Sequence, residues 1–286
     1  MTDLPENYRP VLDKGYVGLL GVHGSDRGVV SPPSAARTSF KKQASEFTEE
    51  QNDRLTHYLM KKSEFACFRH NVMSFEIRMP LFVARQFWKY VVASNWTSDQ
   101  LGWNENSKRY ITEANEFYIP HPGDWRKAAD NKKQGSSGPV DWKLGEELHR
   151  FLKRWTEEGE EIYQRAVELG VAPEQARLFT SNGNYVTVQW TTSLNALLHF
   201  LDERLDSHAQ YEIVQYAKVV EVFFKDSFPV VHKAWTSSRQ ANQQLKLEAE
   251  SFKDVVRENE ALKEEIEALR ARVSESNRPW FKKIFV

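Results

Sequence analysis

Cationic and amide side chains recur at a few short places in the chain, with spacings suited to holding an anion. Arg85 and Lys89 are four residues apart with Gln86 between them, so on a helix the two cations share a face. Three further places are residues 104–110 (NENSKRY), Arg177 and Arg204. Arginine and lysine beside serine and glutamine supply charge and directed donors, which a phosphate-bearing small molecule requires. The pattern predicts a site for a small anionic ligand.

Each of these residues also has a purely structural interpretation. Lys89 lies in QFWKYVVAS, an otherwise apolar helical stretch, where a lysine can extend its charged end to water. Surface ion pairs with Glu174 and Glu203 are equally compatible with Arg177 and Arg204. The sequence contains no glycine-rich phosphate loop, no metalloprotease helix motif and no nucleophile elbow. Spacing by itself therefore leads no further than a small-anion site.

Composition excludes several classes of function. The net charge of −1 leaves no global field that would favour nucleic acid or an anionic membrane. The single Cys67 excludes an internal disulfide framework and a cysteine zinc site, and we predict no metal. We expect neither a secretory signal nor a membrane span, since no apolar run has the required length. A reducing compartment, the cytoplasm, is the expected location.

Hydrophobic periodicity predicts an α+β protein that is mostly helical. Met73, Phe75, Ile77 and Met79 alternate with polar residues, which is typical of a strand, and Pro80 is expected to open the next helix. Strands are also expected at 16–22 and 185–193, and helices near Ser34 and at 48–63, 81–94, 141–170, 172–179, 194–205 and 207–228. Capping boxes are expected for the helices at 48–63 and 207–228. Residues 121–141 are predicted to form a surface loop or lid.

A heptad repeat begins near residue 240. Leu245, Phe252, Asn259, Ile266 and Val273 occupy a positions, and Val255, Leu262 and Leu269 occupy d positions. The pattern predicts a coiled coil, and Asn259 is the kind of polar a residue that sets register in a two-stranded coil. A lone helix lying on the body is the alternative. We therefore expect a catalytic domain at 1–239, a coiled coil at 240–275 and a short amphipathic tail at 276–286.

Several stretches are similar to one enzyme family. They are AARTSF (35–40), FRHNVMSFEIRMPLFVARQ (68–86), NENSKRY (104–110), EFYIP (116–120) and DSHAQYEI (206–213). In order and spacing the chain resembles the flavin-dependent thymidylate synthases. The resemblance implies their fold, a mixed sheet with long helices, and a homotetramer with active sites at subunit junctions. It also implies FAD as cofactor, with NADPH and methylenetetrahydrofolate as co-substrates in the conversion of dUMP to dTMP.

The resemblance further implies roles for individual residues. The residues expected to bind dUMP are Gln86, Lys89, Glu105, Ser107, Arg109, Arg177 and Arg204. Those expected at the flavin are Ser39, Lys89, Tyr90, Val91, Glu105, Ser193, Asn195 and His199. Arg204 matches the arginine that stabilises uracil ionised at N3. A fixed cation there lowers the energy of negative charge on the ring and makes C5 more nucleophilic, so Arg204 is the expected catalytic residue.

The chain departs from the family signature at the flavin. Lys89-Tyr90-Val91 replaces an Arg-His-Arg triplet, and an insertion of about the length of NWTSDQLG precedes Asn104. Ala66 and Arg69 also differ from the family at flavin-contact positions. Two alternatives therefore stand beside the thymidylate synthase. One is an enzyme of the same fold that modifies a pyrimidine nucleotide at C5, for example by hydroxymethylation. The other is a non-catalytic nucleotide-binding scaffold whose coil pairs with itself or with another protein.

Overall fold

The computed structural model describes residues 4–92, 100–105, 115–129, 135–206 and 208–276. For residues 89–92, 100–102, 105, 246 and 274–276 only the backbone is described. The chain divides into two units, Met1–Trp235 and Thr236–Val286. None of the helices in the described ranges is long and apolar enough to cross a membrane.

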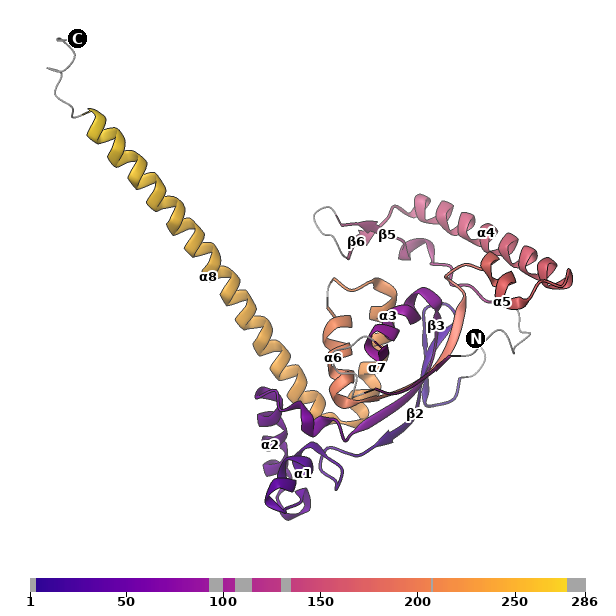
Figure 1. Cartoon of the computed structure of the whole chain (residues 1–286), viewed down its shortest axis with the longest axis horizontal. Coiled ribbons are helices and arrows are strands. Elements are labelled where there is room, and N and C mark those ends of the chain that lie inside the picture. The colour runs from indigo at the N-terminus through magenta and orange to yellow at the C-terminus, as the bar shows by residue number, and fades with distance from the viewer. Residues whose placement is uncertain (1–3, 93–99, 106–114, 130–134, 207, 277–286) are drawn as a thin grey trace, which may run out of the picture. The chain divides into compact units, whose positions relative to one another are not determined.

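A five-stranded sheet is the centre of the first unit (Figure 1). Its strands, in spatial order, are β1 (Tyr8–Val11), β2 (Gly15–His23), β3 (Val72–Pro80), β7 (Tyr185–Ser193) and β4 (Gln100–Glu105). All the pairings among these strands are antiparallel. The predicted α+β class is confirmed, whereas the expectation of a mixed sheet is wrong for the described strands.

Three helices cover one face of this sheet and form the core with it. They are α3 (Leu81–Val92), α6 (Leu194–Arg204) and α7 (Tyr211–Ser227). Phe87 of α3 packs against Trp190, Phe200 and Tyr216, which lie on β7, α6 and α7. The predicted alternation of β3 is confirmed, because Met73, Phe75, Ile77 and Met79 are fully buried. Burying each such side chain stabilises the fold by about 1.5–3 kcal/mol.

The step from β3 to α3 differs from the prediction by one residue. Pro80 is the last residue of β3, opposite Tyr185, and α3 begins at Leu81. The amides of Leu81 and Phe82 donate to the carbonyls of Asn184 and Asn182. The start of α3 is thus held by the chain leading into β7, which places Gln86 one to two turns further along.

The other helices of the first unit lie close to their predicted ranges. α1 is Pro32–Arg37, α2 is Glu49–Lys61, α4 is Trp142–Glu168 and α5 is Pro173–Ala176. Short 3-10 turns lie at Thr38–Phe40, Ala44–Glu46, Phe65–Phe68, Pro122–Asp124 and Arg177–Phe179. The capping box at Thr48 and Gln51 is confirmed. Past the end of α4, Gly170 has φ +87°, a conformation that glycine adopts without strain.

Two other expectations are corrected. In the predicted loop, β5 (Arg126–Ala128) and β6 (Ser136–Pro139) form a separate two-stranded sheet, with exposed side chains on β5. The helix expected from Ser207 begins instead at Tyr211, and its N-cap Gln210 makes no side-chain capping bond. Asp206 explains the later start: its carboxylate accepts from the His208 amide and its carbonyl from the Ala209 amide, which forms a turn. Ser207 itself lies outside the described residues.

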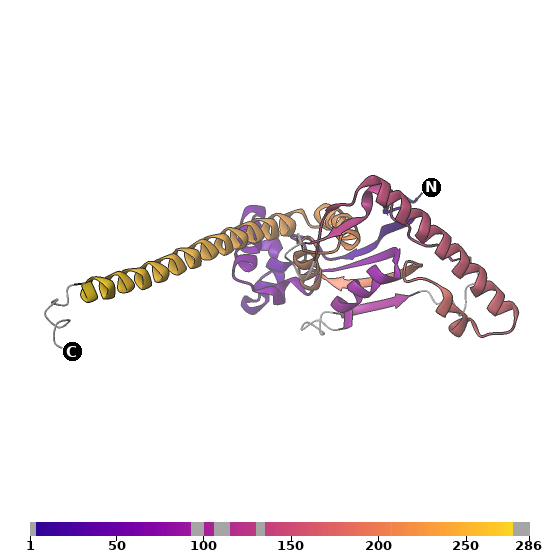
Figure 2. The ribbon, with the colours of Figure 1, turned by 90° about the horizontal axis from the view of Figure 1, so that it is seen from above.

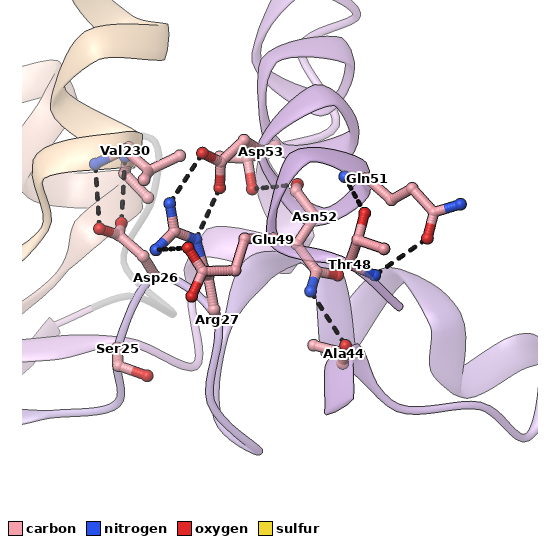
Figure 3. Close-up of polar contacts among 12 residues, drawn as sticks. Ser25, Asp26, Arg27, Ala44, Thr48, Glu49, Gln51, Asn52, Asp53 and Val230 are labelled. Carbon is pink, nitrogen blue, oxygen red and sulfur yellow. Dashed lines mark hydrogen bonds and ion pairs between the residues drawn. The ribbon is translucent and has the colours of Figure 1, made fainter. Parts of the chain in front are cut away.

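Residues 26 and 27 join two distant helices to the loop after β2 (Figure 3). The Asp26 carboxylate accepts hydrogen bonds from the amides of Val230 and Val231, at 2.9 and 3.1 Å. The Arg27 guanidinium donates to both carboxylate oxygens of Asp53 at 2.8 Å and contacts Glu49 at 3.0 Å. The two residues therefore connect α2 with the first turn of the last helix.

That last helix, α8 (Pro229–Ser276), is continuous over 48 residues (Figure 2). It begins earlier than the heptad repeat because Val231, Ala234 and Trp235 pack into the core of the first unit. The helix predicted over residues 240–275 is confirmed, since α8 extends to Ser276. The pairing of the coil and the proposed domain boundaries stay predictions. The tail lies outside the described residues from position 277 on.

Candidate functional site

Gln86 is the predicted nucleotide contact whose surroundings the structure describes most fully. Its amide nitrogen donates to the side-chain oxygen of Gln210, the N-cap of α7. The amide of Gln210 in turn donates to the Glu212 carboxylate at 2.8 Å. Gln86 is thus the first member of a short polar chain that leads from α3 to the start of α7.

Gln210 and Glu212 line a cavity of about 480 Å³ in the first unit. Its wall is largely apolar and includes five aromatic side chains; the residues around it are Phe82, Tyr118, Pro120, Asp124, Trp125, Arg126, Ser136, Leu152, Trp155, Ser181, Asn182, Gly183, Gln210, Tyr211 and Glu212. The volume is in the range typical of small-molecule sites, and an apolar wall with few polar groups is the usual composition of such sites. The cavity can therefore enclose a planar ring and direct a few hydrogen bonds to it.

Two tyrosines supply polar groups at this cavity. The Tyr118 hydroxyl is buried and has no hydrogen-bond partner among the described residues. The Tyr211 hydroxyl donates to Asp124 at 3.4 Å, and the Arg126 guanidinium lies 5.5 Å from the Tyr211 ring centroid. Burial, and then the nearby carboxylates, raise the pKa of both hydroxyls. Both tyrosines therefore stay protonated at neutral pH, and the buried Tyr118 hydroxyl is a donor with no acceptor among the described residues.

The two predicted arginines lie on elements outside this cavity wall. Arg204 is the last residue of α6 and is half-buried. Its charge at a helix C-terminus is favoured by the helix dipole. Arg177 is exposed at the start of the 3-10 turn that follows α5, and its Nε donates to the Glu174 main-chain carbonyl at 3.1 Å. Its described contact is thus with the main chain of Glu174 and not with the carboxylate.

The predicted flavin contacts of α6 lie together at its start. Ser193 is the N-cap, and its hydroxyl accepts from the Ala196 amide at 3.2 Å. Asn195 is buried, and His199 follows it by four residues, so the two share a face of the helix. The Leu194 amide donates to the Asn71 carbonyl at 2.8 Å. This end of α6 is therefore anchored to the residues that lead into β3.

A second, smaller cavity of about 340 Å³ is bordered by Thr38 at the start of the 3-10 turn after α1; Ser39 follows in the same turn, is exposed and is not among the residues that line the cavity. The residues around it are His23, Val29, Val30, Ser31, Ser34, Ala35, Thr38, Lys42, Gln43 and His70. Hydroxyls, imidazoles and a lysine are donors suited to phosphate oxygens. Close by, the buried Oδ1 of Asn71 accepts no hydrogen bond from the described residues. The donor set fits the diphosphate end of a dinucleotide such as FAD.

The remaining predicted contacts are only partly described. Lys89, Tyr90 and Val91 form the last turns of α3, and Glu105 ends β4, but their side chains lie outside the description. Ser107 and Arg109 lie outside the described residues altogether. No group of three or more metal-ligating side chains occurs in the part of the chain that the structure describes.

No binding or catalytic role was assigned to the cavity residues from the sequence. Tyr118 belongs to EFYIP, and Gln210 and Tyr211 belong to DSHAQYEI, two of the stretches that carry the family resemblance. Their position in these motifs could therefore have marked them as candidate site residues. The convergence of these stretches with Trp125 and Trp155 required the tertiary structure, because the residues come from separate elements.

Comparisons with known proteins agree with the resemblance. Residues 25–230 match the family Thy1, described as thymidylate synthase complementing protein. The flavin-dependent thymidylate synthase of Kosmotoga olearia is 35% identical over 238 residues, which cover 83% of this chain and 97% of that protein. A flavin-dependent thymidylate synthase of Thermus thermophilus is 36% identical over 228 residues, covering 80% of this chain and 77% of that protein.

A solved structure is similar as well. The UMP/dUMP methylase PolB of Streptomyces cacaoi, bound with 5-Br dUMP, superposes with a TM-score of 0.68 and 27% identity, over 80% of this chain and 98% of that chain. The match over most of the chain, together with relatives about a third identical, confirms what the motifs indicated. The chain belongs to the thymidylate synthase complementing protein family, that of the flavin-dependent thymidylate synthases.

Proposed function

We propose that this protein is a methyltransferase that converts dUMP to dTMP, using FAD, NADPH and methylenetetrahydrofolate. The observation that carries the proposal is the similarity, over 80% of the chain, to a UMP/dUMP methylase bound with 5-Br dUMP. The curated relatives bear the name of the same activity. The residues that match the family's nucleotide segment, Gln86, Glu105, Ser107, Arg109, Arg177 and Arg204, are present in this chain.

In this proposal Arg204 activates the pyrimidine. A guanidinium beside N3 and O4 favours the ring with N3 ionised, and the extra electron density makes C5 nucleophilic toward the one-carbon unit. The position of Arg204 at the end of α6 suits this role, because a half-buried cation is screened less by water than an exposed one. Ser107, Arg109 and Arg177 are assigned to the phosphate and the sugar.

No protein nucleophile is needed for this chemistry, and the cysteine of the chain is poorly suited to being one. Cys67 is half-buried, and burial, followed by the charge of Glu64, raises the pKa of its thiol. The thiolate is the nucleophilic form of cysteine, so a raised pKa lowers its population at neutral pH. This agrees with activation of C5 by a cation in place of covalent attack by a thiol.

The flavin is assigned to the polar cavity bordered by Thr38 and to the start of α6, with Asn195 and His199 as further contacts. When bound, FAD would carry the reducing equivalents of NADPH to the one-carbon unit. Ser193 already caps α6, so its hydroxyl contributes to the flavin site mainly by fixing the helix start.

We further propose a homotetramer in which subunits complete each other's sites. The predicted nucleotide contacts of one chain come from α3, β4, the turn after α5 and the end of α6, and Arg177 is exposed. An exposed cation that must bind a phosphate is explained if a second subunit supplies the rest of the site. The Met1–Trp235 unit is the part assigned to this assembly.

Modification of a different pyrimidine nucleotide, or a different one-carbon product, is the second candidate. The replacement of Arg-His-Arg by Lys89-Tyr90-Val91 favours it, because lysine lacks the two-pronged donor geometry of arginine and valine donates nothing from its side chain. The similar structure is itself named for both UMP and dUMP. Loss of flavin altogether would give the third candidate, a nucleotide-binding scaffold.

Two measurements separate these candidates. Purified protein is first examined for a flavin absorption spectrum, and a colourless protein that binds dUMP would support the scaffold. It is then incubated with dUMP, UMP or dCMP, NADPH and isotopically labelled methylenetetrahydrofolate, and the nucleotides are resolved by mass. Labelled dTMP from dUMP is the expected product. A hydroxymethylated nucleotide, or labelling of UMP or dCMP in place of dUMP, would overturn the first proposal.

The role of Arg204 has its own test. Arg204→Ala should lower turnover of dUMP by about 10²-fold or more, the usual effect of removing one group that stabilises developing negative charge. Arg204→Lys keeps a charge and should recover part of the activity. Arg165→Ala is the matched control, because Arg165 is exposed on α4 and pairs with Glu168. Near-normal turnover by Arg204→Ala would show that this arginine does not activate the pyrimidine.

A further inference from the structure

The second unit carries a continuous apolar stripe on α8. Phe252, Val255, Leu262, Ile266, Leu269 and Val273 occupy successive a and d positions, with Asn259 between them. These apolar side chains are between 48% and 69% exposed in the single chain. Apolar residues repeating every 3.5 positions along a helix favour a partner helix wound around the same seam. The stripe is therefore a surface suited to packing against a second helix.

The charged residues beside the stripe indicate that the partner is a second copy of this chain. The g positions hold Glu258 and Glu265, and the e positions that follow them by five residues hold Lys263 and Arg270. In a parallel, in-register pair each g residue faces the e residue five positions later on the other helix. Glu258 then meets Lys263 of the second copy and Glu265 meets Arg270, and symmetry doubles both contacts. The chain is therefore complementary to itself.

The antiparallel arrangement lacks this complementarity. There g positions face g positions and e positions face e positions, so Glu258 and Glu265 would oppose one another across the seam. Lys263 and Arg270 would oppose one another in the same way, and like charges in such contacts are destabilising. Asn259 adds a second preference, because its amide can pair with the same amide of a second copy only when the two helices are parallel and in register.

We propose that residues 252–273 of two copies of this chain form a parallel, in-register, two-stranded coiled coil. The proposal rests on the second unit alone and does not depend on the proposed enzyme activity. The ion pair described in this part of the helix lies away from the seam: Arg257 at an f position contacts Asp254 at a c position, at 3.5 Å, on the outer side. Each apolar side chain of the stripe would be covered by its counterpart from the second copy.

Single cysteines at the two ends of the seam test orientation and register in the full-length protein. Val255→Cys and Leu269→Cys are made separately in a Cys67→Ser background, with a size tag on one of them. Both are at d positions, so each variant alone should oxidise to a disulfide-linked dimer in a parallel, in-register pair. Lys253→Cys, at an outward b position, is the control and should cross-link only slightly.

Each other outcome overturns the proposal. In an antiparallel pair each d position faces an a position of the other copy, so neither variant cross-links alone. If Leu262 then lies opposite Asn259, a mixture of Val255→Cys with tagged Ile266→Cys gives a mixed dimer of intermediate size. If another protein or the body of the chain covers the stripe, neither the single variants nor the mixture cross-links above the Lys253→Cys control.

Charge reversal tests whether the g and e charges favour pairing with a second copy of the chain. Glu258→Lys with Glu265→Lys, added to Leu269→Cys, makes all the g and e charges positive and should slow cross-linking several-fold. High salt should restore it, because these contacts are exposed. Glu260→Lys with Glu267→Lys makes the same change of net charge at b positions and should leave the rate unchanged. Equal effects of the two double variants would refute the assignment of the e and g contacts.

Discussion

The contact between Asp26 and α8 offers a quantitative test of how the structure holds its last helix (Figure 3). Pro229 has no amide hydrogen, and the His232 amide donates to the Phe228 carbonyl. The two remaining amides of the first turn, those of Val230 and Val231, both donate to the Asp26 carboxylate. One side chain, 204 residues away in sequence, therefore satisfies both of these donors.

Asp26→Ala leaves the two amides without that acceptor. Loss of a helix N-cap costs about 0.5–2 kcal/mol, and leaving a buried donor unsatisfied costs about 1–3 kcal/mol. Val231 is fully buried whereas Val230 is half-buried, so water can replace the acceptor at only one of them. We expect a loss of about 2–3 kcal/mol in the free energy of unfolding. For a unit of this size the midpoint of thermal unfolding should fall by about 4–12 °C.

Asp26→Asn provides the sharper comparison. Its amide oxygen accepts one of the two hydrogen bonds, but its NH₂ group then faces the other backbone amide, so part of the loss remains. Burial raises the pKa of Asp26, with the two backbone hydrogen bonds opposing that shift. A raised pKa means that the folded protein takes up this proton more readily than the unfolded chain. Wild-type stability therefore gains from this proton uptake as the pH falls through the raised pKa, and the deficit of Asp26→Asn relative to the wild type should grow over that range.

Thermal unfolding at equal protein concentration, followed by near-ultraviolet circular dichroism, is the measurement. Trp235 is a useful reporter because it is buried and its indole donates to Asp202 at 2.9 Å. Asp254→Ala, an exposed change further along α8, serves as the control and should leave the midpoint unchanged. A midpoint for Asp26→Ala within about 1 °C of the wild type would refute the reasoning, since the cap would then contribute less than about 0.5 kcal/mol.

Three further outcomes follow from single contacts. Hydrogen bonding to Arg27 lowers the pKa of Asp53, so this pair stabilises the fold above the ordinary pKa near 3.8, and the stabilisation is lost as pH falls through the lowered value. In Asp53→Asn the free energy of unfolding, measured by urea titrations at a series of pH values, should therefore fall less steeply in acid than in the wild type. Gly145→Ala places a Cβ 2.0 Å from the Pro122 carbonyl oxygen, so it should lower the free energy of unfolding in urea by about 1–3 kcal/mol. An unchanged midpoint would show that α4 can shift away from Pro122 without loss of stability. Tyr118→Phe removes a buried hydroxyl that has no partner among the described residues, so the ligand-free protein should unfold within about 0.5 kcal/mol of the wild type, and a loss above about 1 kcal/mol would reveal a contact.

Local patterns were sufficient for the elements whose cause is local. The alternation from Met73 to Met79 predicted β3, because a period of two places one set of side chains on the core face. Thr48 and Gln51 predicted the start of α2, since a capping box involves only neighbouring residues. The same reasoning failed at the start of α7, where Asp206 forms a turn that competes with the helix.

The candidate site depended on contacts between distant residues. Motifs identified Gln86 and Arg204, and family membership followed from their order and spacing. The pairing of Gln86 with Gln210 and the enclosure of a cavity by Tyr118 and Tyr211 involve elements far apart in sequence, and no periodicity encodes such contacts.

The sequence by itself determined the family, the α+β class and the heptad seam of α8, because each depends on residue types that recur at fixed spacing along the chain. Only the tertiary structure decided that the sheet is antiparallel, that Asp26 caps α8 and which aromatic residues surround the cavity. The physical reason is that strand pairing, a distant cap and a cavity wall depend on how separate segments pack, and many segments of similar local character could have met in their place.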